Sequence, residues 1–321
     1  MKPLIALFIL TAVPVAQAAA PPLRQVGVIP LGEVKGRIDH MSLDAAGSRL
    51  FVAALGNNSV EVVDLVAGKV AQHLAGMQEP QGVRFVADTK MLAVASGGDG
   101  KCRLYDDALK LVSTLDNLDD ADNVRDDGHH FYVGYGKGAV AVCDRKGIIA
   151  SIKLAAHPES FQLESKGNRI FVNVPSARLI EVVDRDRKRV VAQWPVKQAQ
   201  ANFPMALDES RHRLIVVCRN PAKMLVLDTE SGKVVATTDA CGDADDVWLD
   251  EPAHRIYVTG GEGCISVIEQ IDADHYQPAA TIPTARGART SFFDPQKRRL
   301  YLAVPKRDAQ PAEIRVYAPA V

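Results

Sequence analysis

Two nearly identical stretches, "DADNV" at residues 120–124 and "DADDV" at residues 243–247, place carboxylate and amide side chains next to apolar residues. Oxygen atoms of this kind coordinate Ca²⁺ or Mg²⁺, and a nearby imidazole extends the choice to transition metals. Two histidines stand close to further acidic residues, His40 in "RIDH" and His157 in "HPES". A carboxylate near an imidazole also suits general acid–base catalysis. The chemistry open to these residues is therefore cation binding or proton transfer.

The elements that position these residues follow from an internal repeat. Seven segments combine a short polar turn with an apolar strand, and the first apolar residue of that strand recurs about every 42 residues. These residues are Leu50, Met91, Phe131, Ile170, Leu214, Ile256 and Leu300. Further strands follow, as in "SVEVVD" and "GKVAQHL", with β-branched residues in alternation and turn residues between them. Each repeat is thus predicted to be a unit of four strands.

Four-stranded units of this length are typical of a β-propeller. We predict an all-β, seven-bladed β-propeller with four antiparallel strands per blade, forming a single domain over residues 19–321. The seventh repeat ends after its third strand, and "RQVGVIPL" at residues 24–31 is expected to supply the fourth. That pairing joins the first and last blades and removes an open sheet edge.

The strand pattern "RLFVAALGNNSVEVVDLVAGKV" and its six counterparts resemble the YVTN-repeat, or YncE-like, seven-bladed propellers of bacterial periplasms and surfaces, which have WD40-like repeats. A subgroup of that family is similar in carrying "GRIDH", "EPQGV", "DADNV", "HPESFQLE", "NFPMALDE" and "GARTS" at the blade starts. The resemblance implies the fold but no single reaction, and one family member binds single-stranded DNA. Function must therefore come from the site itself.

The start of the chain has the pattern of a secretory signal peptide at residues 1–18. Lys2 precedes an apolar run that ends in the small-residue pattern "AQA" at residues 16–18. No cysteine lies near the expected cut, and no later stretch is long enough to span a bilayer. The protein is therefore expected to be periplasmic or secreted, without a lipid anchor or a membrane span.

Composition and cysteine spacing exclude several classes of function. The formal net charge is −1, so bulk charge gives no reason to expect a polyanionic partner. The five cysteines lack any CxxC spacing, which excludes zinc-ribbon, thioredoxin-like and covalent haem motifs. We expect single buried cysteines in strands, with one disulfide as the alternative.

The repeat places the acidic residues around a central channel. The residue five positions before each turn acid is expected on the innermost strand, which puts Asp39, Asp122, Glu159 and Asp245 around one funnel together with Arg289. Gln81 and Phe203 occupy the matching places in the remaining blades. Water, raised pKa values or a bound cation are the three ways to accommodate so much like charge.

Two kinds of bound partner suit this funnel, and a wet polar channel without either is the alternative. A divalent metal, Ca²⁺ or another, is expected to be held by Asp122, Glu159 and Asp245, and His40 would admit a transition metal. Gluconolactonase-type propellers offer a loose chemical parallel through Glu159, Asn123, Asn202 and Asp245. A small-molecule or protein ligand would instead meet Arg37, Asp39, His40, Gln81, Asn123, Asn202, Arg219, Asp246 and Arg289.

Catalysis has only two candidate residues, His40 and His157. Neighbouring residues of a strand point to opposite faces, so a carboxylate that orients His40 is expected from another blade. His157 and Glu159 would share a face if their strand were regular, but Pro158 interrupts it.

We therefore expect a monomeric, non-catalytic module that binds a small molecule or a protein at its funnel and the adjoining loops. A metal-dependent hydrolase or lyase of lactonase-like type is the first alternative. The second is a single-stranded nucleic-acid binder that uses a rim of basic loop residues, namely Arg178, Arg219, Lys223, Lys306 and Arg307.

Overall fold

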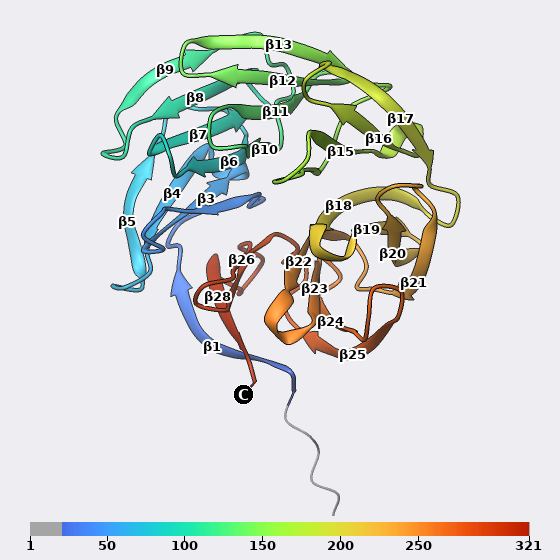
Figure 1. Ribbon diagram of the computed structural model, residues 1–321. Helices are drawn as coiled ribbons and strands as arrows, with labels where there is room; N and C mark the ends of the chain where they lie inside the picture. The colour runs from blue at the N-terminus through green and yellow to red at the C-terminus, as the bar shows by residue number, and fades with distance from the viewer. Residues whose placement is uncertain (1–20, 321) are drawn as a thin grey trace, which may run out of the picture.

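A computed structural model describes residues 21–320, which form seven four-stranded antiparallel sheets arranged in a ring (Figure 1). The seven-bladed β-propeller prediction is confirmed, whereas the predicted signal peptide at residues 1–18 lies outside the described residues. The first strands of neighbouring blades contact one another around the centre, and the fourth strands lie at the periphery.

In the first six blades the strands follow chain order from the centre outward. Blades 1 to 3 are β2 (Met41–Leu43), β3 (Arg49–Ala54), β4 (Ser59–Asp64) and β5 (Lys69–Leu74); β6 (Pro80–Val86), β7 (Met91–Ser96), β8 (Lys101–Tyr105) and β9 (Leu111–Leu115); β10 (Val124–Asp126), β11 (Phe131–Tyr135), β12 (Ala139–Asp144) and β13 (Gly147–Lys153). Blades 4 to 6 are β14 (Phe161–Leu163), β15 (Arg169–Val174), β16 (Leu179–Asp184) and β17 (Arg189–Pro195); β18 (Gln200–Asp208), β19 (Arg213–Asn220), β20 (Ala222–Asp228) and β21 (Val234–Asp239); β22 (Ala244–Asp250), β23 (Arg255–Gly260), β24 (Cys264–Gln270) and β25 (Tyr276–Pro283).

Blade 7 closes the ring with strands from both ends of the chain. It consists of β26 (Ser291–Asp294), β27 (Arg299–Val304), β28 (Glu313–Pro319) and β1 (Leu23–Pro30). β1 pairs antiparallel with β28, so that Leu23 lies opposite Pro319 and Pro30 lies opposite Glu313. The expected closure by the N-terminal strand is confirmed, and Figure 1 shows the two strands side by side. Short 3₁₀ turns occur at η1 (Leu55–Asn57), η2 (Pro175–Ala177), η3 (Glu209–Arg211) and η4 (Glu251–Ala253).

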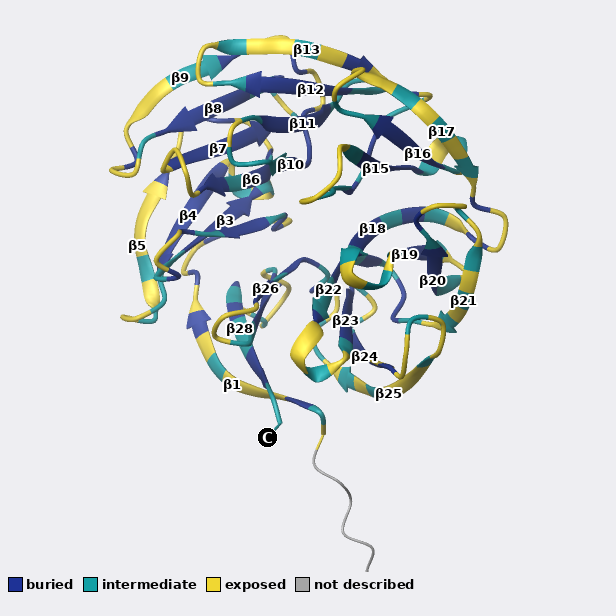
Figure 2. Ribbon diagram, viewed as in Figure 1, coloured by how far each residue is buried: buried dark blue, intermediate teal, exposed yellow. Residues whose placement is uncertain are grey.

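Burial explains why these sequences form this fold. The second and third strands are buried on both faces, whereas outer strands such as β17 alternate between exposed and partly buried residues (Figure 2). Seven apolar clusters each fill the interface between two neighbouring blades. Stacking of adjacent blades therefore provides the core that no single blade has by itself.

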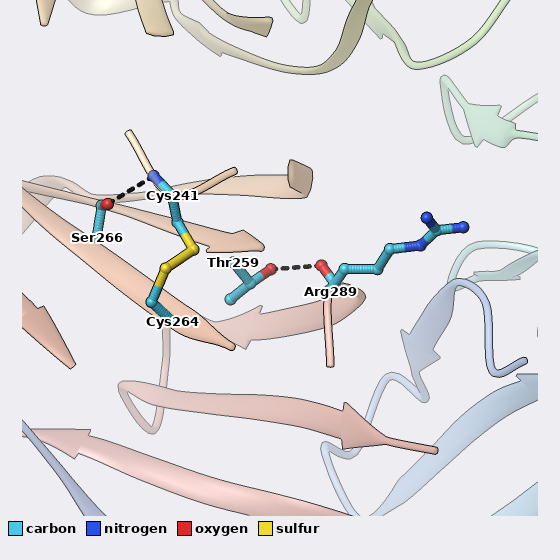
Figure 3. Close-up of a disulfide and its surroundings, with 5 residues drawn as sticks. All are labelled: Cys241, Thr259, Cys264, Ser266 and Arg289. Carbon is cyan, nitrogen blue, oxygen red and sulfur yellow. Dashed lines mark hydrogen bonds between the residues drawn. A yellow bond between two sulfur atoms is a disulfide. The ribbon is translucent and has the colours of Figure 1, made fainter. Parts of the chain in front are cut away.

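The cysteines only partly follow the expectation. Cys102, Cys143 and Cys218 are single and buried, as expected, but Cys241 and Cys264 form a disulfide (Figure 3). Cys241 precedes β22, and Cys264 begins β24 of the same blade, so the ring geometry brings their Cα atoms to 5.9 Å. The disulfide thus anchors the chain segment that enters blade 6.

Within residues 21–320, no helix has the length and apolar character needed to cross a lipid bilayer.

Candidate functional site

The channel mouth is shaped by a β-bulge at the start of the blades. In blade 1, the Asp39 N–H donates to the carbonyl of Ala53, and the Ala53 N–H donates to the carbonyl of His40, so two residues oppose one. The same pattern pairs Asp122 and Asn123 with Gly134, and Glu159 and Ser160 with Asn173. Register shifts occur at the corresponding points of β6, β18 and β22. The predicted equivalence of these positions is confirmed, but strict strand alternation fails there because a bulge re-aims side chains.

Backbone conformation explains the first aspartate of the repeated motif. Asp120 and Asp243 have φ values of 51° and 53°, in the left-handed region. The matching residues of blades 2 and 7, Glu79 and Gly287, have φ values of 49° and 83°. Asp is one of the few residues other than Gly that enter this region readily. Part of the likeness between the two motifs is therefore structural.

The second aspartates of the two motifs have different surroundings, and the copy in blade 6 is neutralised by arginines. Asp245 lies 2.5 Å from Nη2 of Arg219 and 2.9 Å from Nε of Arg289. Asp243 is 3.6 Å and 3.1 Å from the same two guanidinium groups. Arg219 is held in place by stacking 3.7 Å above the ring of Phe203. Asp245 thus belongs to an ion-pair network.

The copy in blade 3 has no such cation. Within the described residues, no Arg or Lys nitrogen lies within 4.0 Å of Asp122. Instead, Asp122, His157 and Glu159 bring one possible ligand atom each to within 4.8 Å of one another. His157 Nδ1 lies 2.6 Å from the carbonyl oxygen of Gly136. Because only an N–H donates to a carbonyl, this contact leaves Nε2 with its lone pair available.

Burial and like charge both act on the carboxyl groups of the mouth. Burial, followed by repulsion from Glu159, raises the pKa of Asp122 well above its ordinary value. Burial, followed by the charge of Asp245, raises the pKa of Glu159 to about 8. Burial likewise raises the pKa of Asp246. Without a cation, burial in the mouth therefore favours the protonated form of each of these three groups.

His40 is surrounded by three carboxylates from three blades. Its Nε2 lies 3.9 Å from Asp39 and 3.8 Å from Asp122, and its Nδ1 lies 3.9 Å from Asp246. Carboxylates of other blades thus flank the imidazole as expected, and Asp39 also lies close because the backbone at residues 39–40 is bulged. All three distances exceed a hydrogen bond, so none of these carboxylates orients the ring in this structure.

The remaining predicted site residues mostly support the frame of the mouth. Arg37 is half exposed and pairs with Asp39 at 2.7 Å. Asn202 is buried and donates to Asn173 Oδ1 at 2.8 Å and to the carbonyl of Leu179 at 3.0 Å, which ties blade 5 to blade 4. Gln81 packs against the backbone of Gly97. Asn123 is buried and donates to Asp122 at 3.4 Å, whereas its Oδ1 has no hydrogen-bond partner within the described residues.

Two cavities lie near the cluster of Asp122, His157 and Glu159. A groove of about 480 Å³ lies beside it on the mouth face and is lined by His157, Glu159, Arg178, Gln200, Phe203 and Asn220, among others. Farther along the channel, a second cavity of about 230 Å³ is lined by His40, Arg84, Arg125, Gln162, Asp246, Trp248 and Phe292, among others. Arg84 and Arg125 were not predicted as site residues, although each lies three residues beyond its blade's funnel position.

Three of the five predicted rim residues, Arg219, Lys223 and Lys306, pair with carboxylates. Besides Arg219, Lys223 lies 2.7 Å from Asp239, and Lys306 lies 3.5 Å from Glu33. This pairing reduces the positive charge that a nucleic-acid strand would meet.

Gly82 allows the backbones of blades 2 and 3 to approach each other closely at the mouth. A Cβ added at Gly82 would stand 1.9 Å from the carbonyl oxygen of Asp122 in the neighbouring blade. We expect Gly82→Ala to lower the free energy of unfolding by about 2 kcal/mol, because the backbone of blade 3 must shift. At Gly147 an added Cβ meets no atom within 4 Å, so Gly147→Ala is the matched control. Equal unfolding midpoints of the two variants in guanidinium chloride would contradict this close approach.

Comparisons with known proteins find likeness of fold alone. No protein-family model and no curated protein matches the chain. Kuenenia stuttgartiensis hydrazine synthase is similar in structure, with a TM-score of 0.72 and 18% identity over 86% of this chain and 96% of that chain. A chain of a mitotic checkpoint complex is similar with a TM-score of 0.79 and 15% identity over 99% of both chains. These structures support the propeller fold, which is typical of binding and scaffold modules and hosts many unrelated functions.

Proposed function

We propose that this protein is an exported, non-catalytic binding propeller of the YncE-like type, which holds a divalent cation at its channel mouth. The observation that carries the proposal is the convergence of Asp122, His157 and Glu159 from two adjacent blades, with ligand atoms within 4.8 Å of one another. Such a cation would balance the charge of Asp122 and Glu159, neither of which has an arginine or lysine nitrogen of the described residues within 4.0 Å.

The donor set favours a transition metal over Ca²⁺. Two carboxylates and one imidazole suit Zn²⁺ or Mn²⁺, whereas Ca²⁺ takes six to eight oxygen ligands. The contact of His157 Nδ1 with the Gly136 carbonyl is the usual outer contact of a metal-bound histidine. Asp245 is left out of this donor set because Arg219 and Arg289 already pair with it.

Binding is proposed rather than catalysis because of the surroundings of His40. This imidazole lies 3.8–3.9 Å from its three carboxylates, too far for the orienting hydrogen bond of an acid–base pair. The mouth instead adjoins the groove of about 480 Å³, which is suited to hold a small molecule or a protein loop next to the cation. Paired rim lysines make nucleic acid a weaker candidate.

Metal titration of chelator-treated protein tests the proposal. We expect one equivalent of Zn²⁺ or Mn²⁺ to bind and to raise the melting temperature. Each of Asp122→Asn, His157→Asn and Glu159→Gln is expected to weaken binding by about 100-fold or more.

Asp245→Asn is the matched control, because it changes the equivalent carboxylate in the other motif and is expected to keep the metal affinity. The proposal fails if none of the divalent ions Zn²⁺, Mn²⁺, Ca²⁺ and Mg²⁺ binds. It also fails if the three ligand variants bind as tightly as the unaltered protein.

A further inference from the structure

The cavity of about 230 Å³ lies farther along the channel than the cation site, and residues of the first strands surround it. His40 and Asp246 form its border with the mouth, since both line the cavity and lie 3.9 Å apart. Its other lining residues include Asp126, two arginines and two aromatic rings. It is a separate environment from the acidic mouth.

Arg125 is one of the two arginines that line this cavity. Its Nη1 donates to the carbonyl of Val124 at 2.9 Å, and its guanidinium stands 5.7 Å from the ring centre of Phe161. No carboxylate of residues 21–320 lies within 4.0 Å of the guanidinium nitrogens of Arg125. Burial, followed by the like charge of Arg84, lowers the pKa of Arg125 to about 10, so the group remains charged at neutral pH. Arg125 is therefore a largely enclosed cation that forms no ion pair within 4.0 Å among the described residues, while the charges of Asp246, Asp122 and Asp126 act on it from farther away.

The two carboxylates that line the cavity are both engaged with other groups. Asp126 accepts from Arg84 Nε at 2.5 Å, and so neutralises that arginine. Asp246 Oδ2 accepts the backbone N–H of Ser291 at 2.7 Å, and its Oδ1 faces His40. Of the two described arginines in the cavity lining, Arg125 is thus the one without a carboxylate in direct contact.

Trp248 and Phe292 form an aromatic wall of the same cavity. Their ring centres are 5.2 Å apart at an interplanar angle of 62°, an edge-to-face pair. Trp248 Nε1 donates to Ser291 Oγ at 3.0 Å, which fixes the orientation of the indole. Such a wall offers a rigid apolar surface to a planar ligand.

We propose that this cavity binds a small organic carboxylate, with its carboxylate paired to Arg125 and its planar apolar body against Trp248 and Phe292. Guanidinium groups pair with carboxylates through two parallel hydrogen bonds, so the charge and the shape of the group are both recognised. A ligand the size of benzoate suits this volume, and an adjoining cavity of about 470 Å³ that shares Arg125, Gln162, Asp246 and Trp248 leaves room for a larger body. The site differs from the proposed cation site in position, in charge and in the residues used.

Benzoate is the probe for this site, and Trp248 is the reporter. The chain has two tryptophans, so a Trp194→Phe background leaves Trp248 as the single fluorophore. We expect benzoate to change its fluorescence, and benzamide, which has the same shape without the charge, to bind at least about ten-fold more weakly. Titrations with and without a chelator are expected to agree, because no metal takes part.

Arg125→Gln is expected to weaken benzoate binding by at least about ten-fold, whereas Arg145→Gln in the exposed turn after β12 leaves it unchanged. Phe292→Leu is the second variant, because it keeps the charge of the cavity. It is expected to weaken the binding of benzoate without strengthening that of benzamide. The proposal is overturned if benzoate fails to bind at about 10 mM. It is also overturned if benzamide binds equally well, if Arg125→Gln has no effect in folded protein, or if inorganic phosphate binds as tightly as benzoate.

Discussion

Metal-free protein is expected to lose stability as the pH rises from about 5 to about 9. The pKa of Glu159 is raised to about 8 in the folded state, from an ordinary value of 4.5, chiefly by burial and then by the charge of Asp245. A raised pKa means that the folded protein binds a proton that the unfolded chain has released. The stabilisation is therefore complete below pH 4.5 and is lost as the pH passes through 8. The raised pKa of Asp122 acts in the same direction.

Glu159→Gln is expected to remove most of this pH dependence. Each pKa unit corresponds to 1.36 kcal/mol, so the effect on the free energy of unfolding is on the order of 4 kcal/mol between pH 5 and pH 9. The measurement is a series of guanidinium unfolding curves recorded between pH 5 and pH 9. The free energy of unfolding of the Gln variant should exceed that of the unaltered protein at pH 9 and match it at pH 5.

Glu164 provides a control with the opposite sign. Although burial opposes it, hydrogen bonds from Arg169 hold the pKa of Glu164 below its ordinary value. Glu164→Gln should therefore lose stability at neutral and alkaline pH, and this cost should shrink as the pH falls from 4.5 through the lowered folded-state pKa. If Glu159→Gln leaves the pH profile unchanged, or if both variants shift stability in the same direction at pH 9, the pKa of Glu159 is not raised in the folded protein.

Removal of the Cys241–Cys264 disulfide is expected to be the second large effect. The bond joins residues 23 positions apart, and closing a loop of this length restricts the unfolded chain by about 3 kcal/mol. The double variant Cys241→Ser/Cys264→Ser should lose about that much free energy of unfolding. Both the double variant and the unaltered protein are measured with and without a thiol reductant. The reductant should lower the stability of the unaltered protein and leave that of the double variant unchanged.

The disulfide also bears on the mouth, because the segment that follows Cys241 carries Asp243 and Asp245. Figure 3 shows the bond near Thr259, whose hydroxyl donates to the carbonyl of Arg289 at 2.7 Å. Arg289 in turn pairs with Asp243 and Asp245. A variant without the disulfide that unfolds at the same denaturant concentration as the oxidised protein would show that blade contacts alone hold this segment.

The fold was predictable because the same pattern of strands and turns occurs seven times in the sequence. Leu50, Met91 and Phe131, and their counterparts, lie within the first two residues of the second strands, since apolar alternation and turn residues are local properties of the sequence. The pairing of β1 with β28 was predictable from an incomplete last repeat. Counting from the turn also placed Asp39, Asp122 and Glu159 in equivalent positions, because equivalent repeats make equivalent backbone hydrogen bonds.

The sequence by itself thus determined a seven-bladed propeller with an acidic channel mouth and the equivalence of its two "DAD" motifs. Tertiary structure alone decided their different roles. Asp245 is neutralised by Arg219 and Arg289, whereas Asp122 meets His157 and Glu159. Tertiary structure alone also decided which two cysteines form the disulfide and that Arg125 lines a cavity. These are contacts between blades, set by bulges and side-chain reach around a closed ring, and no local pattern in a single chain records them.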